Sequence, residues 1–395
     1  MRQRDAAVRA RIESGDEDSV VYFLLFGTAF TRAPRASERD LAALVVRPAD
    51  AIAALKPRMD DFAAALASPG QDERLQFVRA VVERRDIDPA TPAGRLQLRR
   101  YLDERTASVG GSIEYSRVLN PSAGLADKLT VFRDRGLSTD TAIFVDFAID
   151  RALREMKQAG AVSKIQRVAV VGPGLDFTDK LDGYDFYPVQ TIQPFAVIDS
   201  LLALELADER TLQVTAFDIS SRVLQHLESA RSRARTGVPY SVVLPRNSDR
   251  PWTGDLVEYW RRAGTRIGTV VGAPAAPAAA GRVDVRAIAV RPAVVSAMTP
   301  ADLDIVAGRL DLAPGEMFDL VVVTNLFLYY DVFEQSLAAA NIARMLRPGG
   351  FLLTNNRIFE VPSVPLTGTG FTDVVYMSLP GVGETGDRII WYERR

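Results

Sequence analysis

The sequence contains no cysteine and only one histidine, His226, among 395 residues. The lack of thiols excludes disulfides, thiolate zinc sites and cysteine nucleophiles, and a Ser-His-Asp triad could draw on His226 alone. His226 lies in "RVLQHLES", where we expect a solvated helix face rather than a catalytic position. Any reaction that the protein catalyses must therefore use other groups.

An excess of charge of either sign is also lacking. The 48 basic and 50 acidic residues leave a formal net charge of -2, which gives no electrostatic footprint for nucleic acid or for an anionic membrane. The one candidate membrane segment, "VVYFLLFGTAF", is too short to span a bilayer and follows the acidic "GDED", so we expect a buried helix. A cytoplasmic location fits these features, and export after removal of a leader fits the absence of cysteine equally well.

Hydrophobic residues are plentiful, at 47% of the chain, and can supply a substantial core. Residues 1–135 place apolar side chains three and four positions apart, as in "ADAIAALKPRMDDFAAALA", which predicts a helical amino-terminal domain. In residues 136–395 strands and helices alternate, which predicts crossover connections and a parallel sheet covered on both faces.

Seven strands are predicted in this second part, and the last two differ from the others. In chain order they are "RVAVVG", "LQVTAFD", "VDVRAIAV", "FDLVVVTN", "GFLLTNN", "TDVVYMSL" and "DRIIWYER". The Gly-rich "PGVGETG" joins the last two into an antiparallel hairpin. The fold class is therefore α/β: a Rossmann-like, mostly parallel seven-stranded sheet with a C-terminal antiparallel hairpin, preceded by the helical domain. An insertion at about 231–282 carries "PRNSDRPWTGDLVEYWRRAG", which is either a lid over a site or a surface excursion.

The turn after the first strand, "VVGPGLD", holds Gly172, Pro173 and Gly174 where an open parallel sheet binds its ligands. Glycine lets the backbone approach a ligand closely, although the same pattern also serves plain strand-to-helix turns. Asp218 ends the next strand in "TAFDIS", where a carboxylate can accept hydrogen bonds from both hydroxyls of a ribose. The alternative role for Asp218 is to cap the following helix, which Ser220 could do instead.

A third motif, "FDLVVVTNLFLYYD", is followed by a helix and by "MLRPGGFLLTNN". Together with the glycine turn, Asp218 and the terminal hairpin, this order resembles the class I S-adenosylmethionine-dependent methyltransferase family over roughly residues 140–395. The "TNLFLYYD" segment is similar to the chemotaxis-receptor carboxyl methyltransferases in particular. The hairpin and the missing third glycine argue against a nicotinamide oxidoreductase.

The resemblance implies S-adenosyl-L-methionine as the cofactor. The residues that it assigns to cofactor binding lie at the ends of the first four strands or in the turns after them: Gly172, Pro173, Gly174, Asp218, Ile219, Asp302, Leu303, Asn325 and Leu326. The glycine turn would pass under the methionine moiety, Asp218 would hold the ribose and Ile219 would flank the adenine. Asp302 would contact the adenine edge, or alternatively cap a helix.

Two positions depart from the family pattern. Val170 stands where the family usually has an acidic residue, and Asp176 replaces its third glycine. The methionine amino group therefore needs another acceptor. Asp176 and Asp179, just past the turn, are the two candidates that the sequence offers.

The chemistry that the resemblance implies needs few catalytic groups. A sulfonium methyl group is already activated, so its transfer depends mainly on placing the nucleophile within about 3 to 3.5 Å and requires no metal. A carboxylate acceptor needs no base, whereas a phenol or an amine needs a proton acceptor nearby. Tyr329 and Tyr330, which follow the fourth strand, and Tyr187, in "YDFYP", are the candidate catalytic residues, with core packing as their alternative role.

The expected methyl acceptor is a small molecule with an oxygen or nitrogen nucleophile. A nearly neutral chain with aromatic residues in three candidate segments suits a small, partly apolar ligand better than a nucleic acid. The alternatives are methylation of a protein carboxylate and regulatory binding of the cofactor without turnover. The helical domain, including Tyr115 and Arg117, could cover the acceptor site, and the sequence does not fix the oligomeric state.

Overall fold

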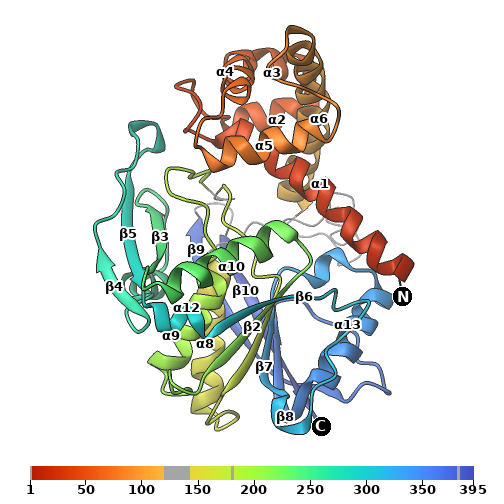
Figure 1. Cartoon of the computed structure of the whole chain (residues 1–395), viewed down its shortest axis with the longest axis vertical. Helices are drawn as coiled ribbons and strands as arrows, with labels where there is room; N and C mark the ends of the chain where they lie inside the picture. The colour runs from red at the N-terminus through yellow and green to blue at the C-terminus, as the bar shows by residue number, and fades with distance from the viewer. Residues whose placement is uncertain (1, 120–142, 179–181, 380–382) are drawn as a thin grey trace.

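The computed structural model describes residues 2–119, 143–178, 182–379 and 383–395, and places a helical part above an α/β part (Figure 1). The helices of the first part are α1 (Arg2–Phe26), α2 (Glu38–Val46), α3 (Pro48–Ala54), α4 (Lys56–Ala67), α5 (Glu73–Glu83) and α6 (Pro92–Leu119). The predicted domain boundary at residue 135 lies outside the described residues.

Local sequence signals explain where several of these helices begin. A capping box between Ser37 and Asp40 opens α2, and the Asp72 carboxylate accepts the Arg74 N–H at the start of α5. The apolar segment of residues 20–25 forms the end of α1, and its side chains are buried. Within the described residues, every helix is too short or too polar to cross a bilayer.

The α/β part alternates strands and helices, as the sequence predicts. Its elements in chain order are α8 (Ile143–Gln158), β1 (Arg167–Val171), α9 (Gln193–Ala203), β2 (Gln213–Asp218), α10 (Ser221–Arg235), β3 (Tyr240–Asn247), α11 (Gly254–Arg262), β4 (Gly268–Val271), β5 (Val283–Val290), α12 (Pro292–Ser296), β6 (Met298–Asp302), β7 (Phe318–Val323), α13 (Val332–Met345), β8 (Leu346–Thr354), β9 (Leu366–Leu379) and β10 (Gly383–Arg394).

The main sheet has the strand order β6-β2-β1-β7-β8-β10-β9. The first five of these strands are parallel, and β10 pairs antiparallel with both β8 and β9. This confirms the predicted α/β class, with seven mostly parallel strands and a terminal antiparallel hairpin. The chain leaves β1 toward β2 on one side and reaches β7 on the other, so the ligand crevice expected of such a sheet lies at the carboxyl ends of β1 and β7.

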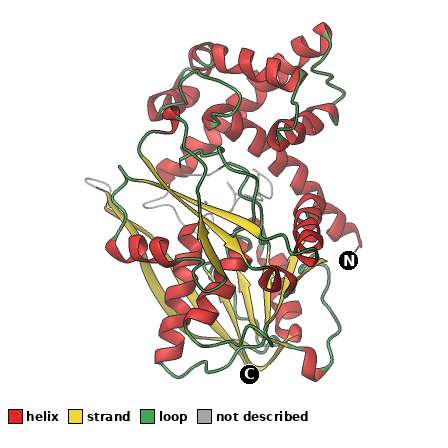
Figure 2. Ribbon diagram, turned by 60° about the vertical axis from the view of Figure 1, so that its left-hand side comes forward, coloured by secondary structure: helices red, strands yellow, loops and turns green. Residues whose placement is uncertain are grey.

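Alternate residues of the central strands enter two separate hydrophobic clusters. Val168 and Val170 of β1 pack with α8, α9 and α10, whereas Ala169 and Val171 pack with α13. The period of two in a strand sends successive side chains to opposite faces. The sheet is therefore covered on both sides (Figure 2), and Val170, fully buried, is a core residue.

The prediction that "VDVRAIAV" is the third strand of the main sheet is wrong. This segment is β5, which pairs with β3 and β4 in a separate three-stranded antiparallel sheet. The third parallel strand is β6, "MTPAD", which is half exposed and contains Pro300 because it forms the sheet edge. The insertion therefore extends to Val290, beyond the predicted end at about 282.

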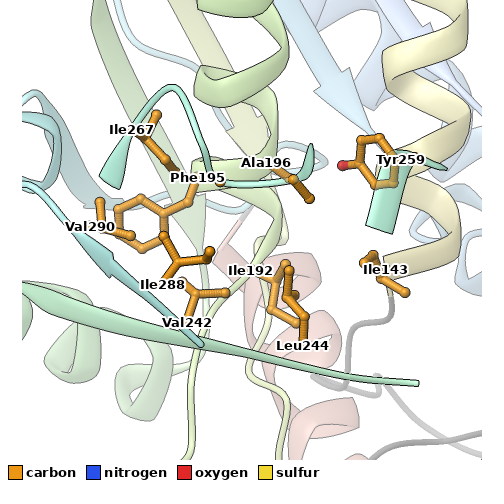
Figure 3. A pocket seen from close by; sticks show the side chains of 12 residues that line it. Ile143, Ile192, Phe195, Ala196, Val242, Leu244, Tyr259, Ile267, Ile288 and Val290 are labelled. Carbon is orange, nitrogen blue, oxygen red and sulfur yellow. The ribbon is translucent and has the colours of Figure 1, made fainter. Parts of the chain in front are cut away.

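Ion pairs and buried backbone contacts hold the insertion onto the α/β core. Arg262 of α11 pairs with the fully buried Asp150 of α8, and Asp199 of α9 accepts the N–H groups of Gly264 and Arg266 at 2.9 and 2.8 Å. Apolar side chains from α9 and the inserted sheet line a small pocket between them (Figure 3). The segment proposed as a lid or surface excursion is thus packed against the core through α11, where Leu256, Tyr259 and Trp260 are buried.

Candidate functional site

Glycine is required at two positions of the turn after β1. Gly172 and Gly174 have φ values of 68° and 64°, in the left-handed region that other residues adopt at a cost of about 1 to 2 kcal/mol. The Gly172 N–H donates to the Phe217 carbonyl at 2.8 Å, which ties the turn to β2. A Cβ atom built on Gly172 would lie 3.9 Å from the Leu326 methyl groups, so the turn faces the residue that follows the end of β7.

Asp218 is buried at the end of β2 and lies within reach of the glycine turn. Its Oδ1 accepts the Ser220 N–H at 2.8 Å, and the N–H groups of Ile219 and Gly174 also point at this carboxylate. Burial raises the pKa of Asp218 to about 6, and the N–H groups oppose that rise. Ser220 makes no side-chain cap to α10, so Asp218 supports the start of the helix while keeping acceptor capacity.

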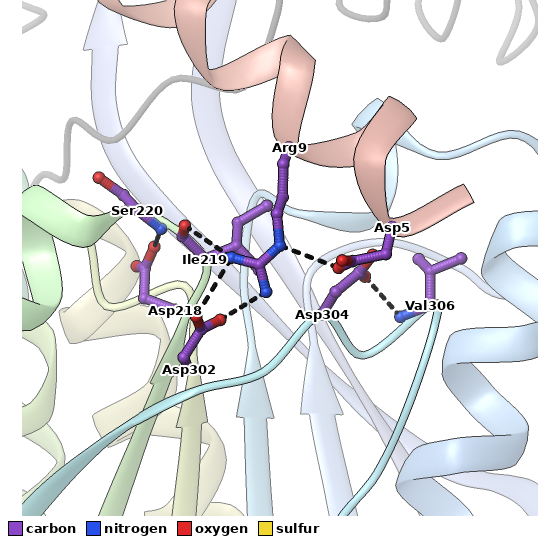
Figure 4. A network of polar contacts seen from close by, with 8 residues as sticks. All are labelled: Asp5, Arg9, Asp218, Ile219, Ser220, Asp302, Asp304 and Val306. Atoms are coloured by element: carbon purple, nitrogen blue, oxygen red, sulfur yellow. Dashed lines mark hydrogen bonds and ion pairs between the residues drawn. The ribbon is translucent and has the colours of Figure 1, made fainter. Parts of the chain in front are cut away.

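The amino-terminal helix α1 reaches down from the helical part and covers the edge formed by β2 and β6 (Figure 4). Arg9 donates to both carboxylate oxygens of Asp302, at 2.6 and 3.3 Å, and to the Ile219 carbonyl at 3.3 Å. Asp5 holds the other side of the Arg9 guanidinium at 3.0 Å. The Asp302 carboxylate, predicted to contact adenine, is therefore engaged by an arginine from the part of the chain predicted to be a separate domain.

Asp304 is a buried carboxyl at this edge that the sequence prediction missed. Its Oδ1 accepts the Val306 N–H at 2.8 Å, and its Oδ2 has no hydrogen-bond partner within the described residues. Burial raises the pKa of Asp304 above the usual range. The sequence signal that could have indicated Asp304 is the second acidic residue of "ADLD". Asp304 offers a buried hydrogen-bond acceptor, whereas the Asp302 carboxylate is exposed and paired with Arg9.

Asn325 and Leu326 follow β7 in a strained turn. Asn325 has a φ of 54°, and it exchanges two hydrogen bonds with Asn355 at the end of β8: its N–H donates at 2.8 Å and its Oδ1 accepts at 2.7 Å. The side chain of Leu326 packs in the cluster on the α13 face, as that of Leu303 does. The two residues thus line the junction of β1, β7 and β8, with Leu326 nearest the glycine turn.

The two tyrosines after β7 are held in place by neighbours. Tyr330 is buried edge-on against Phe327, with ring centroids 6.4 Å apart, and burial raises the pKa of its phenol far above the usual range. Arg11 of α1 donates to the Tyr329 carbonyl at 3.0 Å and forms an ion pair with Glu334 at 2.7 Å. With so high a pKa, Tyr330 is suited to donate a hydrogen bond but not to act as a base.

Tyr187, one of the candidate catalytic residues, is buried in packing contacts. Its ring is buried in a cluster with Tyr184 and side chains of the inserted sheet. Arg74 of α5 donates to the Tyr187 carbonyl at 2.6 Å and stacks near its ring. The aromatic "YDFYP" joins the insertion to the helical part, because a three-stranded sheet needs an apolar cover for its inner face.

The residues proposed for the methionine amino group are only partly described. Asp176 is buried, and its Oδ2 accepts the Gln190 side-chain amide at 3.0 Å. Asp179 lies outside the described residues, as do the side chains of Tyr115 and Arg117. No cluster of three or more metal-ligating side chains occurs among the residues that were placed.

A buried polar network, not predicted from the sequence, supports the end of β7. The Gln193 side chain at the start of α9 donates to Thr324 Oγ1 at 2.7 Å, and it also contacts the carboxyl of Asp146 on α8. Burial raises the pKa of Asp146 well above its usual range. These groups fix the strand end that leads into Asn325.

Replacing Gly172 with alanine is expected to weaken nucleoside binding about tenfold or more while the protein stays folded. The added Cβ strains a left-handed residue by about 1 to 2 kcal/mol and points into the space in front of Leu326. Gly70→Ala is the matched control, because Gly70 has a φ of 56° and open space around its Cβ position, far from the site. Equal affinity in the two variants, measured by calorimetry, would leave the glycine turn with a structural role only.

Comparisons with known proteins identify fold relatives at low similarity. No family model matches the sequence, and no curated protein does. The structure is similar to N-methyltransferase NodS from Bradyrhizobium japonicum WM9, with 13% identity, a TM-score of 0.29, and coverage of 64% of this chain and 99% of that one. It is also similar to MtNAS in complex with MTA and tNA, with 10% identity, a TM-score of 0.29, and coverage of 90% and 97%.

A third similar structure is the magnesium protoporphyrin IX methyltransferase ChlM from Synechocystis PCC 6803 with bound SAM. It shows 11% identity, a TM-score of 0.30, and coverage of 72% of this chain and 97% of that one. The strand order and the terminal hairpin establish the fold: a Rossmann-like α/β sheet of the kind that the class I methyltransferase resemblance implies.

Proposed function

We propose that the protein is an S-adenosylmethionine-dependent methyltransferase. The observation that carries this proposal is the meeting of three elements at the switch point of the sheet. The left-handed glycine turn after β1 faces Leu326 after β7, and the buried Asp218 carboxylate lies between the N–H groups of Gly174 and Ser220. This arrangement suits a ligand with a ribose and an extended chain.

The residues at this edge fit the parts of the cofactor. Asp218 accepts the ribose hydroxyls, and the glycine turn leaves room for the methionine moiety. The Oδ2 of Asp304, which lacks a hydrogen-bond partner in the described part of the chain, provides a buried acceptor for the adenine amino group, with Ile219 and Leu303 as apolar neighbours. When bound, the cofactor supplies an electrophilic methyl group.

The acceptor we propose is a small molecule with an oxygen or nitrogen nucleophile. Two features favour a small ligand over a polymer. The chain is nearly neutral, and α1 lies over β6 and α13, to which it is joined by the ion pairs of Arg9 with Asp302 and of Arg11 with Glu334. Of the three aromatic segments, the one after β7, with Tyr330, is the proposed acceptor-facing segment, because Tyr187 packs beside the inserted sheet and the Trp260 indole donates to the Leu244 carbonyl. Methylation of a protein carboxylate and binding without turnover are the outcomes to be distinguished.

A labelled-methyl assay tests this function. The protein is incubated with methyl-labelled S-adenosylmethionine and, side by side, with a metabolite extract, a protein fraction and RNA. Label is expected in the small-molecule fraction. Label only in protein or RNA would contradict the proposed acceptor class, and tight cofactor binding without any transfer would favour a regulatory role.

Tyr330→Phe is expected to lower kcat about five- to tenfold while changing cofactor affinity less. The loss of one hydrogen bond to the acceptor costs about 1 kcal/mol, and the apolar ring still fills its place against Phe327. Steady-state kinetics with calorimetry of the cofactor measure both quantities. An unchanged kcat would assign Tyr330 to core packing alone.

A further inference from the structure

A polar groove lies along one face of α10, beside the start of α5. Its polar lining consists of Arg222, Gln225, His226, Ser229 and Arg233 of α10, and Glu73 of α5. These α10 positions recur three and four residues apart, so they share one face of the helix. The segment after Tyr187 forms another wall, which separates the groove from the glycine turn: its Thr191 hydroxyl donates to the Pro173 carbonyl.

Positive charge in this groove is not fully compensated. On the neighbouring faces of α10, Arg231 and Arg235 both pair with Glu228, at 3.0 and 3.5 Å. The Arg233 guanidinium has no hydrogen-bond or ion-pair partner within the described residues. Among the described residues that line the groove, Glu73 is the acidic one, and its carboxylate accepts the Val189 N–H at 2.5 Å.

Arg222 is positioned by aromatic rings. Its guanidinium lies 3.8 Å from the centroid of the Phe77 ring and 5.1 Å from that of Phe177. His226 lies between Arg222 and Arg233 along the helix. The positive charges of these two arginines disfavour protonation of its imidazole. Two guanidinium groups around one imidazole form the donor set that carboxylates and phosphates prefer.

His226 is half-buried and hydrogen-bonded, whereas the sequence predicted a solvated position on the helix. The Tyr240 hydroxyl accepts the Thr191 N–H at 2.8 Å, so its own proton points to His226 Nε2, also at 2.8 Å. Neutral His226 therefore carries its proton on Nδ1, which is left as a donor. Burial, and then Arg233 and Arg222, lower the pKa of His226 to about 4; Glu73 and Asp176 act on the adjoining Tyr240.

We propose that this groove binds a small organic or inorganic anion with a carboxylate or phosphate group, held by Arg233, Arg222 and the Nδ1–H of His226. The site is separate from the cofactor edge and does not depend on the proposed methyl transfer. The anion supplies a counter-charge to Arg233, which has no ion-pair partner within the described residues. Because the anion also stabilises the imidazolium, its binding raises the pKa of His226.

The single histidine makes the test direct. The His226 pKa is measured by NMR on histidine-labelled protein in three buffers of equal ionic strength, containing chloride, inorganic phosphate or succinate. We expect phosphate or succinate to raise this pKa by roughly one unit or more relative to chloride. A rise with phosphate alone identifies a phosphate site, and a rise with succinate alone identifies a carboxylate site.

Two variants make the result specific to the groove. Arg233→Gln is expected to abolish the shift, whereas Arg235→Gln, two residues away and paired with Glu228, is expected to keep it. Arg233 is exposed, so its variant should remain folded. The proposal is overturned if neither anion shifts the pKa beyond the chloride value, or if both variants lose the shift equally.

Discussion

Replacing Asp218 with asparagine is expected to weaken binding of S-adenosylmethionine and S-adenosylhomocysteine by about 1.5 to 3 kcal/mol, or roughly 10- to 150-fold. The carboxylate can accept hydrogen bonds from two hydroxyls at once, and it already holds the Ser220 N–H at 2.8 Å. An amide of the same shape keeps that backbone contact but presents one acceptor fewer and no charge. Calorimetric titration of each nucleoside measures the loss.

The free energy of unfolding of the Asp218→Asn variant shows whether a loss of nucleoside affinity comes from the site or from a damaged fold. Burial disfavours the ionised form of Asp218, so the neutral amide should leave the free energy of unfolding at neutral pH unchanged or slightly higher. Asp311→Asn is the matched control, because the Asp311 side chain is 93% exposed. Equal nucleoside affinity in the two variants would remove Asp218 from the site.

The raised pKa of Asp218 predicts how the stability of the protein and its nucleoside affinity change with pH. This pKa is about 6 in the folded protein and about 3.9 in an unfolded chain. A carboxyl with a raised folded pKa contributes stability that is present at low pH and is lost as the pH rises from about 4 through 6. Nucleoside affinity should change the other way and increase as the pH rises through about 6, and the asparagine variant should lack this dependence.

Arg58→Met is expected to cause the largest loss of stability, about 3 kcal/mol or more in the free energy of unfolding. The Arg58 side chain is almost fully buried in the helical part. Its guanidinium donates to four backbone carbonyls at 2.6 to 3.2 Å: those of Leu24, Gly27, Ala33 and Pro34. Methionine fills a similar volume but leaves these carbonyls without a donor in a buried place.

Urea unfolding followed by circular dichroism measures this effect. Burial lowers the pKa of Arg58 to about 10, so the guanidinium remains charged at neutral pH and its hydrogen bonds persist. Arg100→Met is the control, because Arg100 is an exposed residue of α6. If both variants unfold at the same urea concentration, the Arg58 contacts do not organise the end of α1.

The central sheet was predictable because its strands are buried on both faces. β1 and β7 are continuous apolar runs, and the turn and capping signals around them are local in sequence. The third strand was misassigned for the converse reason. As an edge strand, β6 is short and half exposed, whereas β5 has the β-branched pattern of a core strand but buries it in a second sheet.

The site was predictable only where one short segment determines the geometry. The glycine turn and Asp218 belong to such segments. The contact of Arg9 with Asp302 joins residues 293 positions apart, and no local pattern indicates that α1 returns to the sheet. The packing of Tyr187 was not predictable, because an aromatic residue near a binding turn can serve either binding or packing, and no local pattern indicates that its ring joins the cluster beside the inserted sheet.

The measurement that tests the central claim most directly is calorimetric titration of the wild-type protein with S-adenosylhomocysteine and, separately, with a nicotinamide dinucleotide. The geometry of the glycine turn, Asp218 and Asp304 predicts saturable heat with S-adenosylhomocysteine and none with the dinucleotide. Binding of the dinucleotide, without any heat from S-adenosylhomocysteine, would contradict the proposed methyltransferase.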